Sequence, residues 1–167
     1  MLLELYNKSP EPNDSDIAAA LKGLAAIYRS EKRYGEAEPL LMQALEIEEK
    51  TLGPDHMDIA VILNNIAAAY SNQGRYSAAE PLLKRALAVK EKYLGPNDPA
   101  VAVSLNNLAA VYANQGKYAD AEPLLKRALD INEKRLKPSD PAILTSLSNL
   151  AAFYSNIGNY TEAEVFY

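Results

Sequence analysis

The side chains of this chain that could do chemistry are asparagines at fixed spacings. The segment "LNNLAAVYANQG" (105–116) sets Asn106 beside Asn107 and adds Asn114 seven residues later. Because asparagine is a mediocre helix former, its recurrence inside a predicted helix indicates a purpose other than helix stability. An amide carries N–H donors and a carbonyl acceptor, which match the peptide groups of an extended chain. The pattern therefore favours recognition of peptide main chain.

Residues for catalysis or metal binding are scarce. His56 is the only histidine and lies in the predicted loop 53–58, so a histidine metal cluster lacks a second member and a Ser-His-Asp arrangement would depend on this one loop residue. There is no cysteine and no Gly-rich phosphate loop. Carboxylate pairs such as Glu48 and Glu49 fall in helical charge runs. We predict a protein that is not an enzyme and uses no cofactor and no metal.

Charge and hydropathy narrow the class of partner. The net charge of −5 argues against a nucleic-acid partner. RNA binding is further disfavoured because the predicted groove has no stripe of basic residues. No run of about 20 mostly apolar residues exists, which argues against a membrane span. The N-terminus does not read as a signal peptide. The cytoplasm is the default expectation.

Internal repetition organises the chain. Residues 17–58, 59–100 and 101–142 form three blocks of 42 residues, and residues 143–167 repeat the start of a fourth. The second and third blocks agree at 28 of their 42 positions. Residues 1–16 continue the pattern backwards, as the remnant of a preceding repeat. A fixed period of this size predicts a stacked array in one domain, in which each unit covers its neighbour's apolar face.

Each block contains two predicted helices. An apolar stripe at i, i+3, i+4 and i+7 defines the first helix (Leu105, Leu108, Ala109 and Tyr112). Gly116 then ends it in a left-handed conformation. The capping-box spacing of Ser77 and Glu80 predicts the start of a second helix, with Pro81 in its first turn. Asp98 before a proline predicts the cap of the next first helix.

These residues resemble the tetratricopeptide repeat. The third block carries the pattern as Leu108, Ala109, Tyr112, Gly116, Tyr118, Ala121 and Ala128, and the second as Ile66, Ala67, Tyr70, Gly74, Tyr76, Ala79 and Ala86. The 42-residue period is similar to the variant in kinesin light chains and many bacterial multi-repeat proteins. The resemblance implies an all-α, right-handed α-α superhelix whose first helices line a concave surface that binds protein partners. The tyrosines at repeat positions are predicted to be packing residues.

The predicted first helices carry no charge from 59 to 73, 101 to 115 and 143 to 156. A solvated helix face normally collects charges, so these faces are predicted to be sheltered in a groove. We predict that eight asparagines bind an extended peptide of about eight residues there: Asn64, Asn65, Asn72, Asn106, Asn107, Asn114, Asn149 and Asn156. The alternative is a structural role in which the amides bond to adjacent repeats or to water.

Two further expectations concern the ends of the array. Lys22 and Arg29 lie seven residues apart on one face, which predicts an acidic group at one end of the ligand; simple solvated charges are the alternative. The first block has Lys32 where the other blocks have glycine, so its first helix is expected to end less cleanly. Apolar segments at 1–6 and 165–167 predict, as an alternative function, a homo-oligomer formed through uncapped terminal helices, unless the chain is cut from a longer array.

Overall fold

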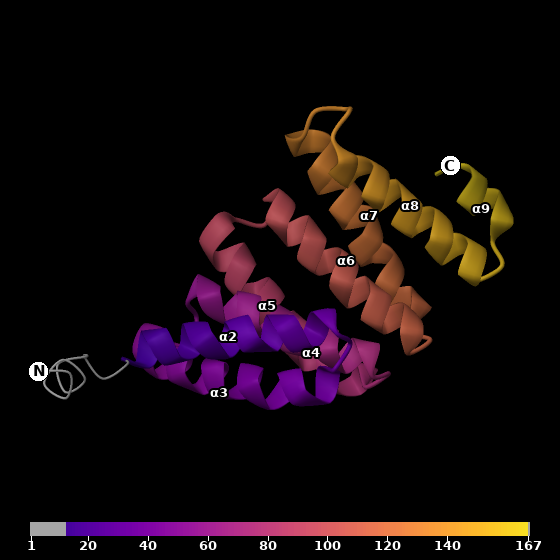
Figure 1. The fold of residues 1–167 in the computed structure, drawn as a ribbon. Helices are drawn as coiled ribbons and strands as arrows, with labels where there is room; N and C mark the ends of the chain where they lie inside the picture. Colours follow the sequence, from indigo (N-terminus) through magenta and orange to yellow (C-terminus); the bar gives the residue numbers. More distant parts are fainter. Residues whose placement is uncertain (1–12, 167) are drawn as a thin grey trace, which may run out of the picture.

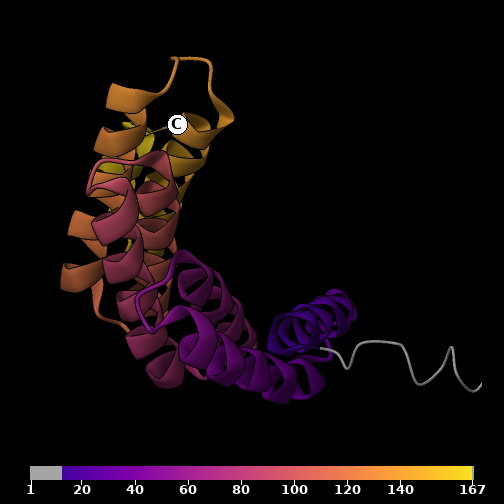
Figure 2. The same cartoon turned by 90° about the vertical axis from the view of Figure 1, so that its left-hand side faces the viewer.

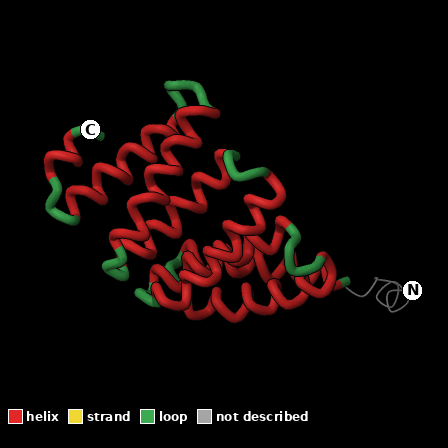
Figure 3. The backbone as a smooth tube through the Cα atoms, turned by 180° about the vertical axis from the view of Figure 1, so that it is seen from behind, coloured by secondary structure: helices red, strands yellow, loops and turns green. Residues whose placement is uncertain are grey.

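A computed structural model describes residues 13–166, and all of its regular elements are helices (Figures 1 and 3). The first helices of the repeats are α2 (Asp14–Ser30), α4 (Met57–Asn72), α6 (Pro99–Asn114) and α8 (Pro141–Asn156). The second helices are α3 (Tyr34–Leu52), α5 (Tyr76–Leu94), α7 (Tyr118–Arg135) and α9 (Tyr160–Glu164). Short loops join them, and no strand occurs within the described range. The residues 1–12 of the predicted preceding repeat, and with them the segment 1–6, lie outside this range.

The helices stack in chain order into a curved array. Each first helix packs on its own second helix, and each second helix packs on the first helix of the next repeat. Figure 2 shows the stack bending between its N-terminal and C-terminal parts. This arrangement gives the array a row of first helices and a row of second helices, so equivalent residues of successive repeats lie side by side.

Alanines at equivalent positions let the helix pairs approach closely. Ala37, Ala79 and Ala121, near the starts of three successive second helices, are fully buried. Larger aliphatic residues share their clusters: Ile66 and Leu41, for example, are buried in one cluster with Ala37. The core is therefore divided into clusters that each join neighbouring helices, as expected of an array in which every unit covers the next.

The turns between the two helices of a repeat depend on one left-handed residue. Gly74 and Gly116 have φ of 72° and 73°, as predicted from their place after the first helix. Lys32 takes the same conformation, with φ of 60°, although it has a side chain. α2 nevertheless ends at Ser30, the position equivalent to Asn72 at the end of α4. The expectation of a less clean end is thus wrong, and Lys32 bears the conformational cost instead.

The predicted start of the second helix of the second block is wrong by two residues. Arg75 is the N-cap of α5 without a side-chain cap, and the capping box of Ser77 and Glu80 is not used. The cause is the glycine turn, in which the Arg75 N–H donates to the Tyr70 carbonyl at 2.8 Å and thereby fixes where the next helix begins. Pro81 consequently lies inside the helix rather than in its first turn.

The loops between repeats end in side-chain caps. The Asp98 carboxylate accepts from the Ala100 N–H at 2.8 Å, which confirms the predicted cap before a proline. His56 occupies the same place before α4, and its Nδ1 accepts from the Asp58 N–H at 3.2 Å. The only histidine is therefore a helix cap, a role that the sequence pattern did not indicate.

Ion pairs tie successive repeats together. The Glu80 carboxylate on α5 accepts a hydrogen bond at 2.7 Å from Lys117, which lies in the turn between α6 and α7. It accepts a second, at 2.6 Å, from Lys84 of its own helix. The hydrogen bonds from these two ammonium groups lower the pKa of the Glu80 carboxyl from 4.5 to about 2, and the bond from Lys117 has the larger effect. Glu38 and Arg75 form the equivalent pair one repeat earlier, at 2.6 Å.

Replacing Glu80 by glutamine is expected to lower the free energy of unfolding at pH 7 by about 0.5–1 kcal/mol, because both lysines are largely exposed. A carboxyl whose folded pKa is depressed stabilises the fold above pH 4.5 and loses that effect as the pH falls toward 2. The difference between Glu80→Gln and the parent should therefore be much smaller in acid. Urea unfolding at pH 7 and pH 2.5 measures this, with Glu133→Gln, an exposed glutamate, as control. An equal difference at both pH values would contradict the coupling.

Candidate functional site

Two neighbouring hollows open on the row of first helices. The first lies between α4 and α6, has a volume of about 200 Å³, and is lined by Asn64, Ala67, Ala68, Ser71, Asn72, Tyr76, Leu83, Asn107, Ala110, Val111 and Asn114. The second lies between α6 and α8, has a volume of about 300 Å³, and is lined by Asn106, Asn107, Ala109, Ala110, Ala113, Asn114, Leu125, Asn149, Ala152, Phe153 and Asn156. Neither lining contains a charged side chain. Both combine amides with an apolar floor.

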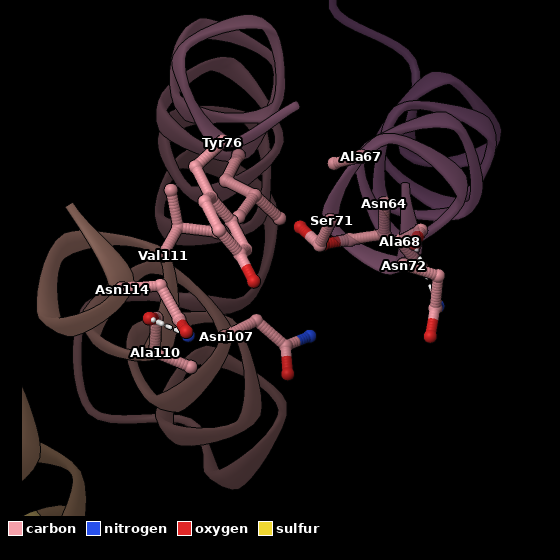
Figure 4. A pocket seen from close by; sticks show the side chains of 11 residues that line it. Asn64, Ala67, Ala68, Ser71, Asn72, Tyr76, Asn107, Ala110, Val111 and Asn114 are labelled. Atoms are coloured by element: carbon pink, nitrogen blue, oxygen red, sulfur yellow. Dashed lines mark hydrogen bonds between the residues drawn. The ribbon is translucent and has the colours of Figure 1, made fainter. Parts of the chain in front are cut away.

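The amide groups that face these hollows are partly free. Figure 4 shows the Asn107 side chain pointing into the space between α4 and α6, without a hydrogen bond to the other residues drawn. Asn72 donates one N–H to the Ala68 carbonyl, and Asn114 donates one to the Ala110 carbonyl, each at 2.8 Å and within its own helix. Their carbonyl oxygens and remaining N–H groups are left to meet a ligand. Asn72, Asn107 and Asn114 are all exposed, so a ligand can reach them from solvent.

The structure brings seven of the eight predicted asparagines to the hollows. Asn107 and Asn114 line both of them, and Asn72, Asn149 and Asn156 line one each. Asn64 and Asn106 also border one hollow each, but they are half-buried and their carbonyl oxygens are buried without a partner among the described residues. The Asn64 amide donates inward, to the Ala60 carbonyl at 2.8 Å. These two asparagines therefore face the helix interface more than the open groove.

Asn65 and the two predicted cations lie at the N-terminal end of the row. The Arg29 guanidinium donates through Nη1 to the neutral Asn65 carbonyl oxygen at 2.6 Å, and within residues 13–166 no carboxylate forms an ion pair with it. Lys22 instead forms an ion pair with Glu48, whose side chain is buried on α3. The structure thus does not place Lys22 and Arg29 together as one cationic pair: Lys22 is compensated by Glu48, whereas Arg29 bonds to Asn65 of α4.

Sequence reasoning missed the contribution of the second helices to the site. Tyr76, the first residue of α5, lines the first hollow and directs its hydroxyl into it (Figure 4). Tyr118 lines a further hollow of about 420 Å³ beside Phe153 and is 44% exposed. Their recurrence at a repeat position predicts packing residues, and Tyr70, Tyr76 and Tyr112 do pack against one core cluster. The residue type alone could not show that Tyr76 also lines a hollow.

One position of the second helices carries polar residues that are buried or half-buried. Glu48, Lys90 and Asn132 are equivalent under the 42-residue shift. Lys90 donates to the Ser104 hydroxyl at 2.8 Å, and burial lowers the pKa of its ammonium group. Asn132 donates to the Ser146 hydroxyl at 3.0 Å. The Ser104 side chain is fully buried, so this serine serves the helix interface and is not accessible to a substrate.

Within residues 13–166, no group of three or more acidic or histidine side chains is placed to hold a metal ion. Among the described helices, none is both long and apolar enough to cross a membrane.

Comparison with solved structures places the fold among helical-repeat proteins. BtubC (BKLC) from P. vanneervenii aligns with a TM-score of 0.84 and 24% identity over 96% of this chain, which spans 64% of that protein. A Podosopora anserina protein of kinesin light chain type, with nearly identical TPR-like repeats, aligns with a TM-score of 0.79 and 28% identity over 98% of this chain and 77% of its own. RapI in its apo form aligns with a TM-score of 0.75 at 18% identity. No curated protein sequence matches.

A family model also matches this sequence. The family model described as Tetratricopeptide repeat matches residues 16–92, 58–134 and 100–167, and these matches start 42 residues apart. Together they cover nearly the whole chain and every described helix. The solved neighbours show the same all-α solenoid of helix-turn-helix repeats, as the sequence pattern predicted. This chain therefore belongs to the tetratricopeptide repeat family.

Proposed function

We propose that the chain is a non-enzymatic scaffold that binds an extended segment of a protein partner across the two hollows between α4, α6 and α8. Tetratricopeptide repeats generally serve as protein-interaction modules, which supports the general class of function. The observation that carries the finer proposal is the uncharged groove lined by amides with free donors and acceptors. An extended segment has unpaired peptide groups, which such amides can satisfy. We keep the cytoplasm as the proposed location.

Arg29 gives the proposed ligand a direction. Its guanidinium lies at the N-terminal end of the row and is held by the neutral Asn65 rather than by a carboxylate. An acidic side chain or a terminal carboxylate arriving there forms a charge-assisted hydrogen bond, which is stronger than a neutral one. Lys22 takes no part, because Glu48 already compensates its charge.

Selection from a random peptide library tests the proposal. The parent protein and an Ala110→Arg variant serve as parallel baits, because Ala110 is exposed and lines both hollows. Peptides that bind the parent and lose at least about tenfold in affinity on Ala110→Arg support the groove. Ala88→Arg is the matched control, since Ala88 is exposed on α5 and lines neither hollow. Selected peptides that bind all three proteins equally would place the binding surface elsewhere.

Self-association is a second candidate, favoured by an exposed apolar face on α2. Ile17, Leu24 and Ile27 are 37%, 41% and 56% exposed, whereas the equivalent residues of α4 are fully buried under α3. We propose that a second copy of the chain covers this face. Light scattering over a wide range of concentration tests it: growth in mass that Leu24→Asp and Ile27→Asp abolish supports assembly, and a monomer at every concentration contradicts it.

A further inference from the structure

The first and second hollows share one framework and differ at only two positions. Every residue that lines the first hollow has an equivalent 42 positions later, which lines either the second hollow or the adjoining third hollow of about 420 Å³. The residue type is the same at nine of these eleven positions, including all the asparagines. The exceptions are Ser71, which becomes Ala113, and Val111, which becomes Phe153.

Two hydroxyl groups distinguish the first hollow. Ser71 and Tyr76 direct their hydroxyls into the space between α4 and α6, and Figure 4 marks no hydrogen bond from either to the other residues drawn. Both side chains are half-buried. The Asn107 amide points into the same space. Because a hydroxyl both donates and accepts, the first hollow presents hydrogen-bonding groups from three helices, α4, α5 and α6.

The second hollow lacks these hydroxyls. Among the described residues that line it there is no serine, threonine or tyrosine, and Ala113 stands in the place of Ser71. Tyr118, the equivalent of Tyr76, lines the third hollow instead, where its ring meets the Phe153 ring edge-on with the centroids 6.2 Å apart. Phe153 also gives the second hollow an aromatic wall. Apart from the asparagine amides, this lining is apolar.

This difference changes which ligand side chain each hollow favours. A side chain that enters the first hollow removes water from the Ser71 and Tyr76 hydroxyls. An apolar side chain leaves both without a partner, whereas an amide or hydroxyl replaces the lost bonds. A charged side chain meets no opposite charge, because none of the described residues lining the first hollow is charged. The hydroxyl-free second hollow instead gains most from buried apolar surface.

We infer that the first hollow selects an uncharged polar side chain (Ser, Thr, Asn or Gln) of the bound segment, and that Ser71 and Tyr76 determine this specificity. The second hollow accepts an apolar side chain. This inference rests on the proposed function and specifies the chemistry of its ligand. Because the two preferences differ, they also fix which part of the segment lies between α4 and α6.

Peptides selected from the random library on the parent protein, and dependent on Ala110, are the probes. Each uncharged polar residue of such a peptide is replaced in turn by an apolar residue of similar size: Gln or Asn by Leu, Thr by Val, and Ser by Ala. Fluorescence anisotropy measures the affinities. At one peptide position we expect a loss of at least about tenfold on the parent. On a variant that combines Ser71→Ala with Tyr76→Phe, the same replacement is expected to cost less than about twofold.

The double variant removes two hydroxyls and keeps the alanine-like and aromatic bulk of both residues. Its matched control combines Ser77→Ala with Tyr34→Phe, because Ser77 and Tyr34 line none of the three hollows. The control should respond to the peptide replacements as the parent does. A peptide series in which no position distinguishes the double variant from the parent would overturn the inference.

A charged replacement tests the other part of the selectivity. Glutamate at the sensitive peptide position is expected to weaken binding at least about tenfold on the parent, and undiminished binding would contradict the selection of an uncharged side chain. If library peptides depend on Ala110 but none has a sensitive position, the groove stands and only the selectivity of the first hollow fails. If library peptides ignore Ala110, the groove itself fails, and the inference fails with it.

Discussion

Replacing Asn107 and Asn114 together by alanine is expected to weaken a groove-binding peptide about 100-fold without loss of stability. Both side chains line both hollows, so the change removes amides from the whole length of the site. A peptide group left without its partner costs about 1–3 kcal/mol, so two such losses of about 1.4 kcal/mol each correspond to about a 100-fold change in Kd. Isothermal titration with a library-selected peptide measures the affinity.

The thermal midpoint distinguishes a binding role from a structural one for these asparagines. Asn107 makes no hydrogen bond to the residues drawn with it, and Asn114 bonds only within its own helix. Alanine is the better helix former, so the midpoint should stay the same or rise slightly. A marked fall would assign Asn107 and Asn114 to the structure of the array. Asn97→Ala in the exposed loop before α6 is the matched control, because alanine keeps the Asn97 carbonyl that accepts from Arg135.

Replacing Leu105 by alanine is expected to have the opposite effect, a loss of about 2–5 kcal/mol in the free energy of unfolding. Leu105 is fully buried where α6 meets α7, in a cluster with Ala128 and Ile131. Replacement by alanine removes the Leu105 Cγ and both Cδ methyl groups and leaves a cavity that the packed helices close only partly. Urea unfolding followed by circular dichroism measures the change.

A neighbouring valine gives the control for this second prediction. Val103 lies two residues earlier on α6 and is 54% exposed, so Val103→Ala is expected to cost no more than about 0.5 kcal/mol. Because each repeat contacts only its neighbours, Leu105→Ala should also broaden the unfolding transition by uncoupling the two halves of the array. Equal stabilities of the two variants would contradict the packing assigned to Leu105.

The periodic sequence was sufficient to predict the helices, their order and most of the groove. The apolar stripe through Leu105 and Leu108 and the glycine after each first helix depend on local geometry, which the sequence carries directly. The absence of charge from the first helices predicted a sheltered surface, and Asn107 and Asn114 do line its hollows. Local signals failed at the start of the second helices, where the bond from Arg75 to Tyr70 overrode the capping box of Ser77.

Only the tertiary structure decided which polar groups remain free for a ligand. Lys22 and Arg29 have the same charge and lie on one helix, yet Lys22 is compensated by Glu48 while Arg29 meets the neutral Asn65. Tyr76 turns into the first hollow. These outcomes join residues 26 or more positions apart, such as Lys22 with Glu48 and Arg29 with Asn65. The sequence alone determined the repeat and the residue types on each helix face. Which side chains of different helices pair with one another depends on how successive helices cross, because that crossing sets which of them come within hydrogen-bond distance.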